Sequence, residues 1–521
     1  MYTIRELAFQ KQVLCLSIMM HSTNQLCNAL QSIIGVFLHA CNTPEGVLEL
    51  LAHLGVSIAP STIVNAVSNL SKESSTAIRK LGGTLLTLYA YDNLDVDFKH
   101  LVPTIENPQN TLVHLTTGSL LPLIHDVTLD DLDCAEFLWK RYQHNFHALP
   151  RDIPNIPFEK LLEIHPEVTT SGDLSRRKRF NAWKYLSDLV EFGPPYFHKF
   201  RRNLGDPEII DAIPIAKTSQ TPLRTLDISP SSPGTNASAL EMFFQQSGIG
   251  DPNRTPGMRD PQNHVILISG DLLTLQHLRS LKMTRAEEST SWGRVQFMVL
   301  VMGLFHLKMA CADAIWRIFI HNKGKSSDPN DLITHISQIR PKETRKIETK
   351  PGFRRMHECI QHVGIVSRLE VWRLAANARF PGVTTLEEFS KLEPKWDVLQ
   401  AMAVQIASRN PTPAEFSRRR VRKVEERDQQ LENMMLREEY FLLYEEISHG
   451  LNHGDIGRVE TCFMPWMFIF AGCGKHKYAA EMRQYLEDVH FVYPEGLRYV
   501  AQILSSSHSD NIFPDLVKLS V

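Results

Sequence analysis

The chain of 521 residues carries 56 Lys and Arg, 58 Asp and Glu and 22 His, which gives a formal net charge of −2. This balance excludes a protein that holds nucleic acid by bulk positive charge, although it leaves local basic patches open. With 43% hydrophobic and 22% charged residues, the composition is typical of a globular chain and unlike that of a disordered one.

The cysteines and the apolar segments indicate the cellular environment. Eight Cys are scattered without a Cys-x-x-Cys pair, which favours a reducing interior over a disulfide framework or a zinc ribbon. The N-terminus lacks a signal-peptide pattern, and the apolar stretches at 295–305 and 462–474 are shorter than the roughly 18–20 residues of a spanning helix. We expect an intracellular protein without a membrane partner, nuclear if it acts on DNA and cytoplasmic otherwise. The sequence carries no signal for an oligomeric state.

The first region, 1–80, is expected to be helical because Leu26, Leu30 and Ile33 begin an apolar series at helical spacing. Core strands are expected within 81–320. The segment 84–98 reads as a strand that runs into a loop, and 111–124 as two short strands that form a hairpin around Thr117-Gly118-Ser119.

A helix and loop insertion is expected at 127–262. It has helices near 130–143, 157–164 and 178–192, followed by a stretch rich in Pro, Ser and Gly. The runs HVILISGD (264–271) and VQFMVLVMGLFH (295–306) are continuous and apolar, which is typical of strands covered on both faces.

The remainder of the chain is expected to be helical. A charged helical insertion spans 321–450, and its last part, 414–450, reads as one long polar helix that a break at Gly450–Gly454 interrupts. Core helices return at 451–490, beginning with a short helix at 455–463 that Asp455 caps, and Pro465 starts or kinks the next segment. A C-terminal tail follows at 491–521.

Two acids follow apolar strands in the same way. Asp92 ends the run LLTLYAYD, and Asp271 ends VILISGD. If these strands are parallel neighbours, both carboxylates lie at the carboxyl edge of one sheet, where open α/β sheets place their ligands. Carboxylates held close together repel each other unless a cation such as Mg²⁺ or Mn²⁺ neutralises them. The alternative is that both acids only make turns at the strand ends.

The order of elements resembles that of the ribonuclease-H-like fold, an α/β core whose mixed sheet has three successive strands followed later by two more, with large, mainly helical insertions. In that fold the first and fourth strands are parallel neighbours, and a helix after the fifth strand supplies a third acid. We therefore expect Asp92, Asp271 and Glu460, in the segment GDIGRVE, to share the metal. Glu445, Glu446 and Asp455 are rivals for the third place, although Asp455 lies about 140° around the helix from Glu460.

His306 is a further candidate catalytic residue because it is the last residue of the expected fifth strand, 295–306. Many cut-and-paste DNA transposases with this fold carry a Cys- or Asp-x-x-His motif there. The segment GLFH is similar in part, since Gly303 stands in the first position. The alternative is a partly buried histidine that only makes hydrogen bonds.

Three basic clusters are candidate contacts for DNA phosphates. The alternative is that they are solvated faces of polar helices. The residues are Arg176, Arg177, Lys178 and Arg179, then Lys199, Arg201 and Arg202, and finally Arg418, Arg419, Arg420, Arg422 and Lys423.

The chain as a whole resembles the family named domain of unknown function 6589, which is common in mushroom-forming fungi. The resemblance spans about 28–490, and the family implies no established activity. Transposases are similar only in element order and in the placement of the acids. The segments that carry the family resemblance are NALQSIIGVFLHACNTP (28–44), YDNLDVDFK (91–99), HLTTGSLLPL (114–123), GDLLTLQHLRSLK (270–282), GLFHLKMACADAIWR (303–317) and HGDIGRVE (453–460).

Two functions are compatible with these observations. One is a transposon-derived protein with a Mg²⁺-dependent site for DNA cleavage or strand transfer. The other is a catalytically inactive module that keeps the fold for binding or scaffolding. The abrupt helical start also fits a fragment of a longer element protein.

Overall fold

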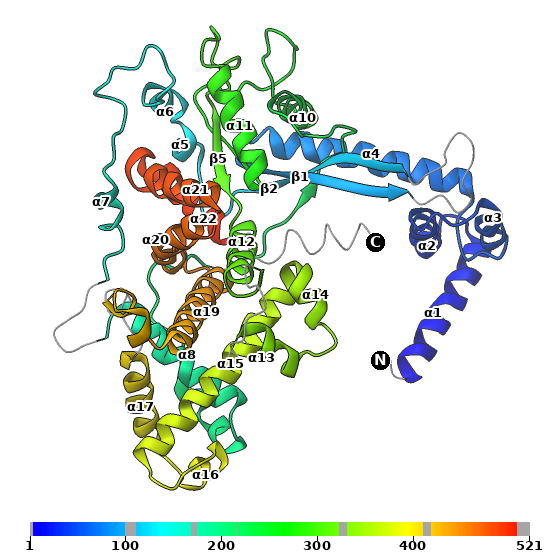
Figure 1. The fold of residues 1–521 in the computed structure, drawn as a ribbon. Coiled ribbons are helices and arrows are strands. Elements are labelled where there is room, and N and C mark those ends of the chain that lie inside the picture. The colour runs from blue at the N-terminus through cyan, green and yellow to red at the C-terminus, as the bar shows by residue number, and fades with distance from the viewer. Residues whose placement is uncertain are drawn as a thin grey trace. The chain divides into compact units, whose positions relative to one another are not determined.

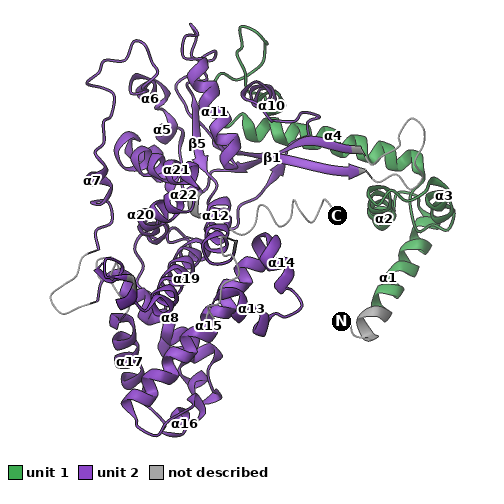
Figure 2. Ribbon diagram, in the orientation of Figure 1, with its two compact units in different colours: residues 1–84, 242–260 green, residues 85–241, 261–521 purple. Residues whose placement is uncertain are grey.

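The computed structural model describes residues 4–98, 111–167, 174–214, 216–321, 331–409 and 418–507. The chain forms two compact units (Figure 2). One contains residues 1–84 and 242–260, and the other contains residues 85–241 and 261–521. Of the expected C-terminal tail, residues 508–521 lie outside the described part of the chain.

The first unit is helical, in the region where the sequence predicts helices. A small core of Leu48, Ile58 and Ile63 holds it together. Gly82 packs so closely on Ser247 that a Cβ atom would not fit there, which explains a glycine in the last turn of a helix. The helices are α1 (Ile4–Thr23), α2 (Ala29–Ala40), α3 (Glu45–His53) and α4 (Pro60–Gly82).

The second unit contains a mixed five-stranded sheet in the order β3-β2-β1-β4-β5 (Figure 1). β1 is antiparallel to β2 and parallel to β4, β2 is antiparallel to β3, and β4 is parallel to β5. The predicted mixed sheet within a helix-rich chain is therefore confirmed. The strands are β1 (Thr87–Phe98), β2 (Thr111–Pro122), β3 (Thr221–Pro222), β4 (Ile266–Gly270) and β5 (Met298–Met302).

The predicted hairpin within 111–124 is wrong. β2 is a single strand, and Gly118 and Ser119 lie inside its ladder opposite Tyr91 and Ala90. A turn at this point would break backbone hydrogen bonds that the long partner strand β1 supplies. The third strand, β3, is only two residues long and follows about a hundred residues later.

The two strands predicted from continuous apolar runs exist and are largely buried. β4 is buried at four of its five positions, and so is β5. Strand β5 ends at Met302, and α12 (Leu304–Trp316) begins two residues later, so the strand predicted to run through 306 is shorter than expected.

Helices make up most of the second unit. Those before β5 are α5 (Leu129–Leu132), α6 (Ala135–Lys140), α7 (Phe158–Leu161), α8 (Arg176–Phe192), the 3-10 helix η1 (Pro195–Phe200), α9 (Arg201–Leu204), α10 (Pro233–Gln246), which begins in this unit, and α11 (Leu272–Thr284). Those after α12 are the π-helix η2 (Arg317–His321), α13 (Leu332–Ile339), α14 (Thr344–Thr349), α15 (Gly352–Arg379), α16 (Leu386–Lys391), α17 (Trp396–Arg409), the 3-10 helix η3 (Val424–Glu426), α19 (Gln429–His453), α20 (Ile456–Gly472), α21 (His476–Glu487), the π-helix η4 (Asp488–Val492) and α22 (Glu495–Ser507).

The chain turns between α19 and α20 where the sequence predicts a break. Gly454 adopts the left-handed conformation that ends α19, and the Asp455 side chain caps α20 by accepting a hydrogen bond from the Arg458 backbone N–H. Helix α20 continues through Pro465 to Gly472, beyond the expected end at 463. Trp466, whose side chain is fully buried directly after the proline, anchors this second half in the core.

A buried arginine organises the helical part of this unit. The Arg368 guanidinium on α15 has no exposed surface and contacts three carboxylates: Asp188 on α8, and Glu438 at 3.5 Å and Glu445 at 3.3 Å on α19. Around it, α8, α15, α16 and α17 share an apolar core that includes Trp372. A charge removed from water in this way is stable only while its partners remain.

None of the helices in the described ranges is long and apolar enough to cross a membrane.

Arg368→Met is expected to lower the free energy of unfolding by about 3 kcal/mol, because Asp188 and Glu445 would lose the buried guanidinium and keep Lys184, at 3.0 and 3.7 Å, as a cationic partner. Arg373→Met is the matched control, since Arg373 lies on the same helix but forms a partly exposed pair with Glu370. It is expected to cost much less, because solvent screens the charges of this pair. Urea denaturation of both variants measures the difference, and equal losses would contradict the role given to Arg368.

Candidate functional site

The two candidate acids lie at neighbouring positions of parallel strands. β1 and β4 pair in parallel, and the last paired residues are Ala90 and Ser269. When this register is continued for two more residues on both strands, Asp92 lies beside Asp271. The structure therefore brings these two predicted site residues together at the carboxyl edge of β4.

Asp92 does not end its strand, contrary to the expectation from the sequence. β1 continues to Phe98 because β2 pairs with it along its whole length, and Asp92 lies opposite Thr117 in that ladder. The acid is therefore held on a rigid strand, at the point where β4 stops pairing with β1.

Asp271 is the first residue after β4 and caps α11. Its Oδ1 accepts a hydrogen bond of 2.7 Å from the Thr274 backbone N–H. The preceding Gly270 allows the tight passage from strand to helix, because a Cβ atom there would lie 2.8 Å from Thr274 Cγ2 and 3.3 Å from the Tyr91 carbonyl oxygen.

Asp92, Asp271 and His306 act on one another electrostatically. Burial raises the pKa of Asp92, and the charge of Asp271 raises it further. A hydrogen bond of 2.7 Å from the Asn93 backbone N–H and the charge of His306 act in the opposite direction, but the net pKa is raised. Two neighbouring carboxylates at a half-buried position are an arrangement that a cation stabilises.

His306 lies in the first turn of α12 and not at the end of a strand. Gly303, the residue between β5 and α12, permits this, because a Cβ atom there would lie 3.2 Å from the Gly270 carbonyl oxygen and 3.3 Å from His306 Cδ2. Gly303 is the position at which the similar transposase motif has Cys or Asp. A larger side chain at this position would press on the backbone of β4.

Two tyrosines near Asp271, the buried Tyr91 and the half-buried Tyr478, were not predicted. Burial and the charge of Asp271 raise the pKa of Tyr478, on α21, to about 12, and they raise the pKa of Tyr91 as well. The Tyr91 hydroxyl donates a hydrogen bond of 2.9 Å to Asn236, whose side-chain amide lies 3.0 Å from His277 Nδ1. Tyr91 directly precedes Asp92, which could have drawn attention to it, whereas the sequence has no signal that links Tyr478 to Asp271.

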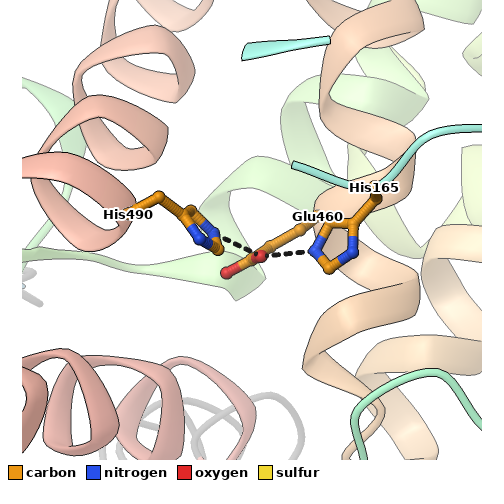
Figure 3. A group of neighbouring side chains, drawn as sticks. All are labelled: His165, Glu460 and His490. Carbon is orange, nitrogen blue, oxygen red and sulfur yellow. Dashed lines mark hydrogen bonds and ion pairs between the residues drawn. The ribbon is translucent and has the colours of Figure 1, made fainter. Parts of the chain in front are cut away.

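Glu460 belongs to a different group of side chains. Its Oε2 accepts hydrogen bonds from His165 Nε2 at 2.8 Å and from His490 Nε2 at 2.7 Å (Figure 3). Tyr485 donates to its Oε1 at 3.3 Å. Burial acts to raise the pKa of Glu460, but the hydrogen bonds and charges of the two histidines lower it to about 2.

The distance along α20 separates Glu460 from the sheet edge. The charge of Asp271 raises the pKa of Tyr478, so Tyr478 lies near this sheet edge. The Tyr478 ring packs on Phe470 of α20, with ring centroids 5.5 Å apart. Glu460 precedes Phe470 by ten residues, which is about 15 Å along a helix. The register of β1 and β4 thus places Asp92 and Asp271 at one sheet edge, where the charge of His306 also acts on Asp92, whereas the Glu460 carboxylate bonds to His165 and His490.

The rival third acids have structural contacts of their own. Glu446 forms ion pairs with Arg177 at 3.1 Å and with Arg458 at 3.2 Å. Glu445 contacts the buried Arg368 described above. Asp455 caps α20 and also accepts hydrogen bonds from the backbone N–H groups of residues 210 and 211. All three acids stabilise the helical part of the chain.

The basic cluster at the start of α8 is largely engaged inside the protein. Arg177 also donates to the Thr461 carbonyl oxygen at 2.9 Å, Arg176 donates to Pro166, Lys178 donates to Ser408, and Arg179 pairs with Glu208. By contrast, Arg418, Arg419 and Arg420 are exposed. The exposed cluster is therefore the better candidate for contacts with phosphates.

Asp92→Asn is expected to stabilise the metal-free chain at neutral pH. The ordinary pKa of this carboxyl is 3.8, and the folded state raises it. Below pH 3.8 both states bind the proton and the carboxyl has no effect. Between pH 3.8 and the raised folded-state pKa the unfolded state has lost the proton that the folded state still binds, so the native chain loses stability as the pH rises, and above the folded-state pKa the loss stays constant. Asn cannot ionise and keeps an oxygen for the Asn93 N–H, so its advantage should grow over this pH range and then level off.

Denaturation of both proteins over a range of pH measures this difference. Asp95→Asn is the control, since Asp95 lies on the same strand and is exposed. If the Asp92→Asn variant and the native chain differed in stability by the same amount at every pH, this would contradict the claim that folding raises the pKa of Asp92.

Comparison with known proteins identifies the family. A family model described as "Family of unknown function (DUF6589)" matches residues 154–503, a range that contains Asp271, His306 and Glu460 and begins after Asp92. No curated protein and no solved structure matches the chain. Because the family model matches more than half of the sequence, the chain belongs to DUF6589, a family of unknown function.

Proposed function

We propose that this chain is a transposase-derived protein in which Asp92 and Asp271 bind Mg²⁺ or Mn²⁺ for cleavage or strand transfer at a DNA phosphodiester. The observation that carries the proposal is the parallel pairing of β1 with β4, which aligns both acids at one edge. The sheet order β3-β2-β1-β4-β5 supports it, because ribonuclease-H-like enzymes are expected to have their first and fourth strands as parallel neighbours.

The chemistry of the two side chains fits a hard divalent ion. Both ligands are carboxylate oxygens, and the raised pKa of Asp92 reflects burial and repulsion that a bound cation would relieve. Mg²⁺ commonly keeps several water molecules and binds through one or two carboxylates together with substrate phosphates, so two acids suffice. When bound, the ion would activate water and stabilise the leaving oxygen.

The protein groups around the acids have separate tasks in this proposal. Rigid β1 and the cap of α11 fix Asp92 and Asp271, so that little reorganisation accompanies binding. His306 is the candidate general acid or base because its charge acts on Asp92. The exposed Arg418, Arg419 and Arg420 are candidate contacts for the DNA backbone. A protein acting on DNA in this way would work in the nucleus.

A second function, a binding or scaffolding module without catalysis, is favoured by the environment of Glu460. The expected third acid, Glu460, accepts hydrogen bonds from His165 and His490 and so has partners other than Asp92 and Asp271. Such a protein would keep the fold for recognition alone and would have no need of a nuclear location.

Divalent-ion-dependent nicking of supercoiled DNA separates the two functions. Asp92→Asn and Asp271→Asn are expected to lower the rate by at least about 100-fold, because a metal ion contributes several kcal/mol to transition-state stabilisation. Asn is as good an N-cap as Asp, so the second variant should keep helix α11.

Asp95→Asn is the matched control on β1 and is expected to keep full activity. A native chain that does not nick DNA with Mg²⁺ or Mn²⁺, or variants at Asp92 and Asp271 that nick as fast as the native chain, would contradict the proposed enzyme and favour the scaffold.

A further inference from the structure

Three side chains that are far apart in the sequence meet at one point inside the second unit. His165 lies in the loop after α7, Glu460 on the second turn of α20, and His490 in the π-helix η4. Their ligand atoms all lie within 4.8 Å of one another, and among the described residues they are the one such group of three or more His, Cys, Asp or Glu. Figure 3 shows the two imidazoles approaching one carboxylate from different elements.

The geometry is close to that of a metal site. Both Nε2 atoms lie 2.7–2.8 Å from the same oxygen, Glu460 Oε2. Ligands at Zn²⁺ lie about 2.0–2.1 Å from the ion, which in a tetrahedral site separates two ligand atoms by about 3.3 Å. Opening each of the two nitrogen–oxygen pairs by roughly half an ångström would reach this separation, and the two nitrogens already lie within 4.8 Å of each other.

The surroundings suit an ion that needs a fixed and largely dry site. The side chain of Glu460 has no exposed surface, and those of His490 and His165 are 7% and 19% exposed. Tyr485 orients the carboxylate through its second oxygen at 3.3 Å, as partners of metal ligands commonly do. His490 sits in a π-helical turn, a rare conformation that often occurs at functional sites.

The donor set selects the kind of metal. Two imidazole nitrogens and one carboxylate oxygen suit Zn²⁺ and the neighbouring transition metals, whereas Mg²⁺ and Ca²⁺ prefer oxygen ligands alone. Three protein ligands leave one tetrahedral position for water.

We propose that His165, Glu460 and His490 form a binding site for one transition-metal ion, with Zn²⁺ as the expected occupant. The site is separate from the acids at the sheet edge. The ion joins the loop after α7, helix α20 and the π-helix η4, so its binding stabilises the contacts among segments up to 325 residues apart in the chain.

Titration of the full chain, after treatment with a chelator, tests this site. Zn²⁺ is expected to bind with a single high-affinity equivalent and to raise the melting temperature. Co²⁺ is expected to give the intense visible absorption of a four-coordinate ion, which the hydrated ion lacks. A native chain that binds neither ion tightly, or a Co²⁺ spectrum that remains that of the hydrated ion, would overturn the proposal and leave a hydrogen-bonded cluster without metal.

Variants locate the bound ion. Glu460→Gln and His165→Gln are expected to weaken Zn²⁺ binding by more than about 100-fold, since loss of an outer-shell partner alone commonly costs 10–100-fold. His114→Gln is the matched control, because His114 also contacts a carboxylate, that of Asp95 at 2.7 Å, but on an exposed surface.

Asp92→Asn distinguishes this site from the proposed catalytic one. It is expected to leave Zn²⁺ binding unchanged while it removes nicking activity, so either proposal can fail alone. Zn²⁺ binding that survives Glu460→Gln, or that is lost in Asp92→Asn, would overturn the assignment. Circular dichroism of each metal-free variant separates loss of a ligand from loss of the fold, and the Co²⁺ spectrum of the native chain needs no variant.

Discussion

The parallel pairing of β1 with β4 is the constraint on which the candidate active site depends. It fixes the register that puts Asp92 beside Asp271, and it does so in the middle of a sheet whose strands are tied on both sides. The backbone pairing holds both acids at one edge, and burial and repulsion raise the pKa of Asp92. The repulsion between the two half-buried carboxylates lowers the stability of the folded chain at neutral pH. Proteins commonly accept such a loss at positions where function requires a particular arrangement of charges.

Buried ionic contacts organise the helices in a comparable way. Arg368 joins α8, α15 and α19 through three carboxylates, and Arg177 and Arg458 join α8 to α19 and α20 through Glu446. These contacts also give structural roles to residues that the sequence offered as candidates for DNA binding, such as Arg177, or for catalysis, such as Glu445 and Glu446. A basic run is a nucleic-acid surface only if its charges reach solvent, and at the start of α8 most of them bond to other parts of the protein.

Local patterns predicted the elements well where one physical signal dominated. The apolar run before Asp271 gave β4, and the acid and glycine between α19 and α20 gave the cap and the turn. Errors arose where tertiary contacts decide. Gly118 is a residue type typical of turns, but here its backbone pairs with Tyr91 of β1 inside the sheet. Glu460 looked like a third acid at the sheet edge, whereas its partners His165 and His490 lie 295 and 30 residues away, and no local pattern links them.

Anomalous diffraction from crystals of the full chain grown with Mn²⁺ tests the central claim most directly, because it locates the ion without relying on activity. The account predicts a manganese peak between the carboxylates of Asp92 and Asp271, at the carboxyl edge of β4. Manganese bound elsewhere, with these two side chains making only protein contacts, would contradict it and return both acids to a structural role in the strand and the helix cap.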